Sequence, residues 1–286
     1  MKPPHFLIVD GYTKAAREQL QSGGASVAAD LYAAMLKKCS PPESTFEIVF
    51  PSDPDIDLPS GRELSSYDGI AWTGCSLCLN DESVEVCQQV EFARATFAAG
   101  IPGFGSCWAA QIAVVAAGGR VQANPHGREM GFARKIQLTP TGRSHPLFEG
   151  KPSVFDAFIS HDDEITHLPP GSECLATNAW TSIQAVCVTY LGTPFWGLQY
   201  HPEYDLHELA RLTYCRIEKL IRYGFFKSEQ AAHEYVDMLE ALHQDPTRKD
   251  IAWLLGIDAD VMNEDVRLTE VRNWVNNLVL PGLRPS

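Results

Sequence analysis

The feature that most constrains the fold is the alternation of short apolar runs with helical patterns in the first half of the chain. The apolar runs, each ended by a turn residue or leading into a helical pattern, are residues 6–9, 46–50, 68–74 and 101–105. The segments with apolar residues at helical spacing are residues 25–38, 82–99 and 108–117. This alternation predicts an open, mostly parallel α/β sheet with helices on both faces.

The second half of the chain predicts more strands and then only helices. The further strand candidates are residues 134–139, 155–159, 174–177, 183–189 and 195–200. After Tyr204, apolar residues at helical spacing predict one amphipathic helix that runs to Ile221, and a last helix covers residues 271–279. We therefore expect two parts, an α/β domain at residues 1–222 and a helical C-terminal extension at residues 223–286.

Composition excludes several classes of protein. The 286 residues carry a formal net charge of −13, so the chain lacks the basic surface that a nucleic acid partner needs. No apolar run reaches the roughly 18 residues of a membrane span, and the N-terminal run is too short for a secretory signal. The eight cysteines are scattered, which predicts reduced thiols and a cytoplasmic location.

One cysteine follows the fourth predicted strand directly. In open α/β sheets, ligands bind at the carboxyl ends of the strands, and Cys107 would lie at such an end, on the turn into a helix. A sharp turn there presents the thiol above the sheet, the helix N-terminus favours the thiolate, and the Trp108 N–H points toward an oxyanion. These properties indicate a nucleophile; a small buried apolar cysteine is the alternative.

A thiol nucleophile needs a base, and the segment after the last predicted strand supplies one. His201 and Glu203 are two positions apart, so both side chains project to one face of an extended segment. The carboxylate can then hold the imidazole tautomer that accepts the thiol proton. The alternative is a surface His and Glu in a turn made by Pro202.

Taken together, these motifs resemble the class I glutamine amidotransferase family, whose members are Cys-His-Glu amidases with a flavodoxin-like α/β fold. The family pattern is Gly-x-Cys-x-Gly-x-Gln followed about ninety residues later by His-Pro-Glu. Here residues 105–111 read Gly-Ser-Cys-Trp-Ala-Ala-Gln, and His-Pro-Glu begins at residue 201, 94 positions after the cysteine. The resemblance covers about residues 5–222 and is greatest to the domain found in GMP synthetase.

The resemblance implies a catalytic role for five residues. Cys107 attacks the side-chain amide carbon of a glutamine-like substrate, and His201, oriented by Glu203, protonates the departing nitrogen and later activates water. Gly74, in the loop after the third strand, and Trp108 donate backbone N–H groups to the oxyanion. The reaction that the resemblance implies needs no metal and no cofactor.

The resemblance also implies three substrate-binding residues. Gln111 is carried over as a substrate contact, although an amide that caps the helix is the alternative. Ser160 and His161 begin a strand-end segment whose backbone meets the amino-acid head group of the substrate in the family.

Two departures from the family pattern bear on the pocket. Ala109 stands where the family has Gly, so its methyl group would crowd the turn or the pocket behind the nucleophile. The loop after Gly74 reads Cys75-Ser-Leu-Cys78, where relatives often have Gly, Ser and Pro, which suggests an altered pocket or an oxyanion hole that forms only on activation. Cys75 and Cys78 could also form a redox pair or half of a zinc site, but no matching second pair exists in the sequence, and incidental cysteines are the simplest interpretation.

Three functions remain open at this stage. The preferred one is an amidase that acts on small molecules, glutamine or γ-glutamyl amides. The second is a glutaminase subunit that delivers ammonia to a separate synthase or ligase, and the third is a catalytically silent regulatory relative. The sequence contains neither a phosphate-binding P-loop nor a dinucleotide fingerprint, so ATP chemistry is not expected, and a homo-oligomer remains open.

Overall fold

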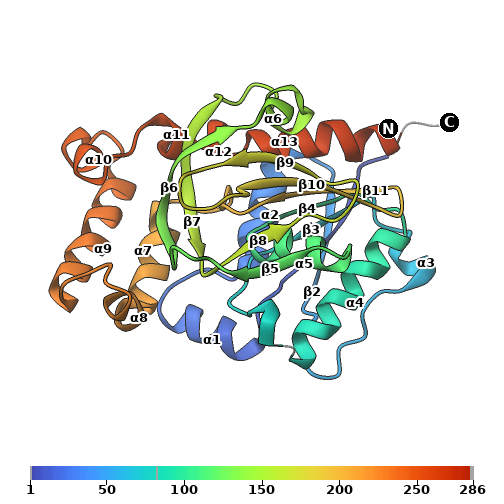
Figure 1. The fold of residues 1–286 in the computed structure, drawn as a ribbon, viewed down its shortest axis with the longest axis horizontal. Coiled ribbons are helices and arrows are strands. Elements are labelled where there is room, and N and C mark those ends of the chain that lie inside the picture. The colour runs from blue at the N-terminus through green and yellow to red at the C-terminus, as the bar shows by residue number, and fades with distance from the viewer. Residues whose placement is uncertain (1, 82, 284–286) are drawn as a thin grey trace.

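A nine-stranded sheet forms the centre of the computed structural model, which describes residues 2–81 and 83–283 (Figure 1). Its strand order is β2-β1-β3-β4-β11-β10-β9-β6-β7, and β5 and β8 form a separate two-stranded sheet. In chain order the strands are β1 (His5–Val9), β2 (Thr45–Val49), β3 (Gly69–Trp72), β4 (Gly103–Ser106), β5 (Arg120–Ala123), β6 (Glu129–Leu138), β7 (Val154–His161), β8 (Asp163–His167), β9 (Glu173–Thr177), β10 (Ala185–Tyr190) and β11 (Thr193–Leu198).

The five strands from β2 to β11 are parallel, and they include the four apolar runs of the first half of the chain. A parallel strand is covered on both faces, so it needs apolar side chains at successive positions. Phe6 and Ile8 contact the core on one face of the sheet, whereas Leu7 and Val9 contact the core on the other. The strands from β11 to β7 are antiparallel, so the predicted α/β sheet is confirmed as a mixed sheet whose parallel half leads to the site.

Helices cover both faces of this sheet. Those of the first 150 residues are α1 (Lys14–Ser22), α2 (Ala28–Cys39), α3 (Gly61–Leu64), η1 (Leu79–Asp81), α4 (Val84–Ala98), α5 (Trp108–Ala116), α6 (Pro140–Ser144) and η2 (Pro146–Phe148). Those after β11 are α7 (Leu206–Cys215), α8 (Ile217–Arg222), α9 (Glu229–Gln244), α10 (Lys249–Leu255), α11 (Ala259–Met262), α12 (Glu264–Arg267), α13 (Thr269–Trp274), η3 (Val275–Val279) and α14 (Leu280–Gly282). Helices α4 and α5 pack on one face, and α2 and α13 pack on the other.

The C-terminal helices pack against the sheet as well as against one another. Trp274 of α13 is fully buried, and its ring lies 5.7 Å from Phe6 and 5.6 Å from Phe104, both in the parallel strands. Helix α9 packs instead on α7, at the end of the molecule away from β2 (Figure 1). The division at residues 222 and 223 therefore stays a prediction about chain organisation, with α13 contributing to the core of the first part.

The chain departs from the predicted helix at residues 206–221 in one place. Two helices, α7 and α8, occupy this stretch, and Arg216 between them has φ −121° and ψ 13°, which is not helical. Its N–H donates to the Thr213 carbonyl in a tighter turn. The apolar spacing continues through this break, so periodicity alone could not locate it. None of the helices among the described residues has the length and apolar character needed to cross a membrane.

Candidate active site

Cys107 lies on the turn between β4 and α5, as the sequence predicted. Its backbone has φ 53° and ψ −107°, a conformation that costs a side-chain-bearing residue on the order of 1–3 kcal/mol. The Cys107 N–H donates to the Leu198 carbonyl at 2.6 Å, which ties the turn to β11. Gly105 and Ala109 pack closely beneath this turn: a Cβ added to Gly105 would lie only 2.3 Å from the Ala109 Cβ.

Ala109 is fully buried beneath this turn. Its methyl group faces Gly105 in the core, and Ala109 is absent from the residues that line the pocket above Cys107. The departure from the family pattern therefore changes the packing under the nucleophile and leaves the lining of the pocket unaltered.

His201 and Glu203 follow β11 and lie beside this turn. The His201 Nδ1–H donates to Glu203 Oε1 at 2.7 Å, and both side chains are buried. The His201 N–H donates to the Phe158 carbonyl at 2.8 Å, so β7 also holds the segment. The ring of Tyr204 stacks on the His201 ring, with 4.0 Å between centroids and 3° between planes. These contacts hold the imidazole in one orientation.

Gly74 shows how near the imidazole comes to the cysteine. A Cβ built on Gly74 would lie 3.0 Å from His201 Cε1 and 3.5 Å from Cys107 Cβ, so all three residues meet at one point. His201 Nε2 is buried and makes no hydrogen bond of normal geometry within the described residues. Burial lowers the pKa of His201, but the Glu203 carboxylate and the neighbouring Cys107 sulfur outweigh it and raise this pKa to about 9.

Gly74 and Trp108, whose N–H groups are the predicted oxyanion donors, both adjoin Cys107. Trp108 is the first residue of α5, so its N–H has no partner within the helix. In the loop after β3, Thr73 Oγ1 accepts from the Gly11 N–H at 3.0 Å and donates to the Gly74 carbonyl at 2.8 Å. A side chain at Gly74 would meet the His201 ring, which accounts for glycine there.

The predicted substrate residues Gln111, Ser160 and His161 all line the pocket above Cys107. Gln111 Nε2 donates to the Asp163 carbonyl at 2.8 Å and to Gln199 Oε1 at 3.0 Å, so its amide also joins α5 to the strands beside it. The Cys107 thiol donates to the Ser160 carbonyl at 3.6 Å. The backbone of Ser160 thus faces the nucleophile. The contacts of Gln111 are consistent both with a substrate contact and with a structural amide at the helix.

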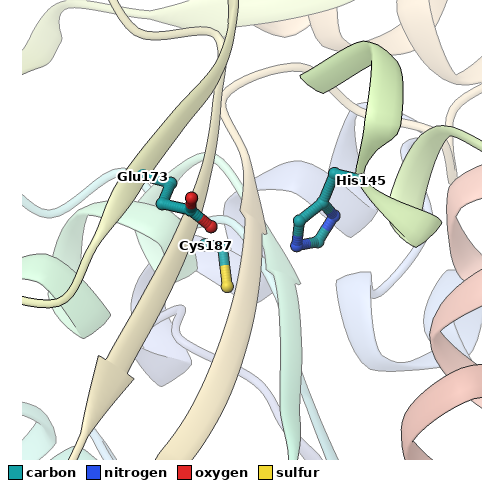
Figure 2. Close-up of side chains that lie close together, drawn as sticks. All are labelled: His145, Glu173 and Cys187. Carbon is teal, nitrogen blue, oxygen red and sulfur yellow. The ribbon is translucent and has the colours of Figure 1, made fainter. Parts of the chain in front are cut away.

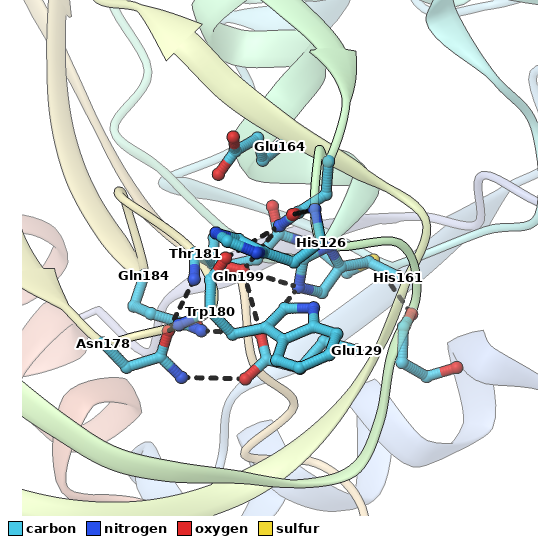
Figure 3. A network of polar contacts seen from close by, with 12 residues as sticks. His126, Glu129, His161, Glu164, Asn178, Trp180, Thr181, Gln184 and Gln199 are labelled. Carbon is cyan, nitrogen blue, oxygen red and sulfur yellow. Dashed lines mark hydrogen bonds and ion pairs between the residues drawn. The ribbon is translucent and has the colours of Figure 1, made fainter. Parts of the chain in front are cut away.

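The side chain of His161 belongs to a buried polar network (Figure 3). Its Nε2 lies 3.1 Å from Glu129, which also accepts from Asn178 at 2.8 Å, Thr181 at 2.9 Å and Gln184 at 2.9 Å. Burial raises the pKa of Glu129, but these donors, His161 first, outweigh it and lower the pKa. The His161 ring therefore anchors the strand end, and the residue also lines the pocket above Cys107.

The pocket also contains residues that sequence analysis did not identify. It has a volume of about 130 Å³, and the additional lining residues are Tyr12, Arg128, Asp162, Asp163, Tyr204, Arg216 and Lys219. They come from loops and helices far apart in the chain, and no local motif marks them. The loop at residues 75–78, which the sequence did single out, also lines the pocket.

A separate group of side chains could offer three ligand atoms to a metal (Figure 2). His145, Glu173 and Cys187 place one such atom each within 4.8 Å of the others, among the described residues. However, His145 Nδ1 accepts the Leu147 N–H at 3.1 Å, so a neutral ring carries its proton on Nε2. Burial raises the pKa of Cys187 to about 11. With its proton on Nε2 and its Nδ1 already accepting a hydrogen bond, His145 has no free lone pair for a metal, and none of the three residues lines the pocket.

Comparison with known proteins places this geometry in a family. The family model described as glutamine amidotransferase class-I matches residues 67–213. The chain is 34% identical to a gamma-glutamyl-L-1-hydroxyisopropylamide hydrolase from a Pseudomonas species, over 98% of this chain and 95% of that protein. It is also 39% identical to the glutamine-hydrolyzing GMP synthase of Thermomicrobium roseum, over 36% of this chain and 18% of that protein.

Solved structures share the fold. A glutamine amidotransferase from Thermotoga maritima superposes with a TM-score of 0.66 at 14% identity, covering 98% of this chain and all of that one. A glutamine amidotransferase from Methylobacillus flagellatus gives 0.63 at 20% identity, covering 96% and 95%. Since the family model and a relative of nearly the same length agree, this chain belongs to the class I glutamine amidotransferase family.

Proposed function

We propose that the protein is a cysteine-dependent hydrolase that cleaves the amide bond of glutamine or of a γ-glutamyl amide, releasing glutamate and ammonia or an amine. The observation that carries this proposal is that Cys107 and His201 line one pocket and that Glu203 holds the His201 ring by a hydrogen bond. The full-length relative named for a γ-glutamyl amide supports the substrate class.

In the first half of the reaction, the sulfur of Cys107 attacks the amide carbon. Because the pKa of His201 is raised to about 9, its imidazole takes the proton of the Cys107 thiol and holds it as the imidazolium while the sulfur attacks. The C–S bond forms, and the oxyanion receives the N–H groups of Gly74 and Trp108, each contributing roughly 3–4 kcal/mol. His201 then gives its proton to the nitrogen as the C–N bond breaks, and the amine leaves.

In the second half, water replaces the amine. Neutral His201 takes one proton from the water, whose oxygen attacks the thioester carbon. The C–S bond breaks, glutamate leaves, and His201 returns to the imidazolium form beside the thiolate. Glu203 keeps its bond to Nδ1 throughout, so Nε2 always faces the reacting atoms.

A second function is favoured by one observation, the similarity to the glutamine-hydrolyzing GMP synthase. In that alternative, the chain is a glutaminase subunit that delivers ammonia to a synthase or ligase partner. A homo-oligomer and a cytoplasmic location likewise stay predictions.

The pure chain distinguishes these functions. It is incubated with glutamine and with a panel of γ-glutamyl amides of increasing size, and glutamate release is measured. Fast release from a substituted amide by the chain alone supports the hydrolase. Weak release from glutamine that rises only with a partner supports the ammonia-delivering subunit, and no release with any substrate supports a silent relative.

A further inference from the structure

Three cations line the catalytic pocket. Arg128, Arg216 and Lys219 all line it, in a chain whose formal net charge is −13. Arg128 precedes β6, whereas Arg216 lies in the α7–α8 break and Lys219 lies on α8. The break in the helix thus occurs at the residue that faces the pocket.

Two of these cations already have a counter-ion. Arg128 Nη1 lies 2.6 Å from Asp162 Oδ2, and Lys219 Nζ lies 3.0 Å from the same oxygen. Burial raises the pKa of Asp162, but these two cations outweigh it and lower the pKa. One carboxylate therefore serves two positive charges.

Arg216 has no such counter-ion. Its Nη1 donates to Ser160 Oγ at 3.0 Å, and Tyr12 is its other polar partner. No described carboxylate lies within ion-pair distance of its guanidinium group. The other lining carboxylate, Asp163, accepts instead from the Cys78 thiol at 3.1 Å. A guanidinium group stays charged, and placing it in a pocket without a counter-ion is costly unless a ligand supplies one.

We propose that Arg216, supported by Arg128 and Lys219, forms a subsite that binds a carboxylate of the substrate. The planar fork of a guanidinium group matches the two oxygens of a carboxylate, and its bond to Ser160 Oγ orients it. This inference rests on the proposed function, since γ-glutamyl amides carry the anion that it requires.

A carboxylate has two sources in such substrates. One is the α-carboxylate of the glutamyl group, which every substrate has. The other is a carboxylate on the leaving amine, as in γ-glutamyl amino acids. The geometry is compatible with a carboxylate on the leaving amine. The leaving nitrogen meets His201, and the His201 ring stacks on Tyr204. Tyr204 in turn lies within electrostatic range of Arg216. Either source would place a carboxylate at the guanidinium group of Arg216.

The test uses Arg216→Gln, which removes the charge, and Arg216→Lys, which keeps it without the fork. Arg222→Gln is the matched control, because Arg222 is also on α8 but is exposed and lies outside the pocket. The ligands are glutamine, 4-aminobutanamide (glutamine without its α-carboxylate), γ-glutamylglycine and γ-glutamylglycinamide. For each, KM and kcat are measured, or a competitive inhibition constant where turnover is too slow.

If the α-carboxylate binds Arg216, Arg216→Gln raises KM about tenfold to a hundredfold for glutamine and for both γ-glutamyl compounds, and leaves the affinity for 4-aminobutanamide unchanged. If the carboxylate of the amine binds there, the rise is confined to γ-glutamylglycine. In either case Arg216→Lys restores part of the affinity and Arg222→Gln behaves as wild type.

Two results would overturn the subsite. One is an equal loss for all four ligands, including 4-aminobutanamide, because Arg216 would then act on the structure of the pocket and not on an anion. The other is wild-type affinity of Arg216→Gln for every ligand. In both results the unchanged protein still releases glutamate, so they are distinct from a failure of the proposed function, in which wild type itself releases none.

Discussion

Ser106 donates a hydrogen bond to Glu203 across the active site, although 97 residues separate them in the chain. Its Oγ lies 2.9 Å from Glu203 Oε1, the oxygen that also accepts from His201 at 2.7 Å, and Tyr32 OH lies 2.6 Å from the same Oγ. Ser106 directly precedes the nucleophile, so one strand end positions both the sulfur and the carboxylate that orients the base.

Ser106→Ala is therefore expected to slow the reaction without weakening substrate binding. Losing one hydrogen bond to a charged group should lower kcat about tenfold, with KM little changed. Ser106→Thr keeps a hydroxyl group and should retain most of the activity. Steady-state kinetics on one γ-glutamyl amide checks this, and an increase in KM alone would place Ser106 outside the positioning of Glu203.

Cys107→Ser should abolish turnover, by at least about 10⁴-fold, because a hydroxyl group is a far poorer nucleophile beside the same base. The pocket is otherwise intact, so the variant should still bind substrate. Glutamate release and calorimetric binding measure the two effects separately. A near-normal rate would show that another group attacks the amide.

Glu203→Gln should slow the reaction less than His201→Ala does. Glutamine at residue 203 weakens the orientation of the imidazole but leaves the base in place, which should cost about 10²–10⁴-fold, whereas removing the imidazole should cost more. Both variants are compared by kcat/KM on the same substrate. The opposite order would contradict the assigned roles.

The pH profile should have an alkaline limb near pH 9. The pKa of His201 is raised from its ordinary 6.5 to about 9, so the imidazolium persists below that pH and the proton needed by the leaving nitrogen is lost above it. The activity of wild type should fall as pH rises through about 9.

The Glu203→Gln variant provides the matched comparison for this profile. The Glu203 carboxylate is the largest of the influences that raise the pKa of His201, so its neutralisation should move the limb to lower pH. Profiles of kcat/KM for both proteins measure this shift, and an unmoved limb would assign the titration to another group.

Trp274→Ala should destabilise the whole chain, because this side chain of the C-terminal helices is fully buried against strands of the sheet. Removing it should lower the free energy of unfolding by about 3–5 kcal/mol. Trp253→Ala is the control, since Trp253 is 87% exposed and its removal should cost under about 0.5 kcal/mol. Urea unfolding compares the two, and equal effects would show that α13 contributes little to the core.

Much of the fold could be predicted because its signals are local. The apolar runs that form β1 and β3 need no knowledge of their neighbours, since a strand buried on both faces is apolar at every position. The break at Arg216 could not be predicted in this way, because the apolar spacing continues through it and a contact with Ser160, 56 residues earlier, accompanies it. Likewise, the sequence indicated His161 as a substrate residue, but the bond of its ring to Glu129 became visible only in the folded chain.

The sequence alone determined the family and the α/β fold, both of which the comparisons confirm, and it placed Cys107 on a strand–helix turn. The turn at Cys107 and the two-residue spacing of His201 and Glu203 depend only on neighbouring residues, so the sequence alone can reveal them. Tertiary structure alone decided which charges share the pocket, because Arg128 and Lys219 reach Asp162 from segments far apart in the chain. Such contacts depend on how the elements pack. Packing is the result of many weak interactions between segments that can be close in space however far apart they are in the chain.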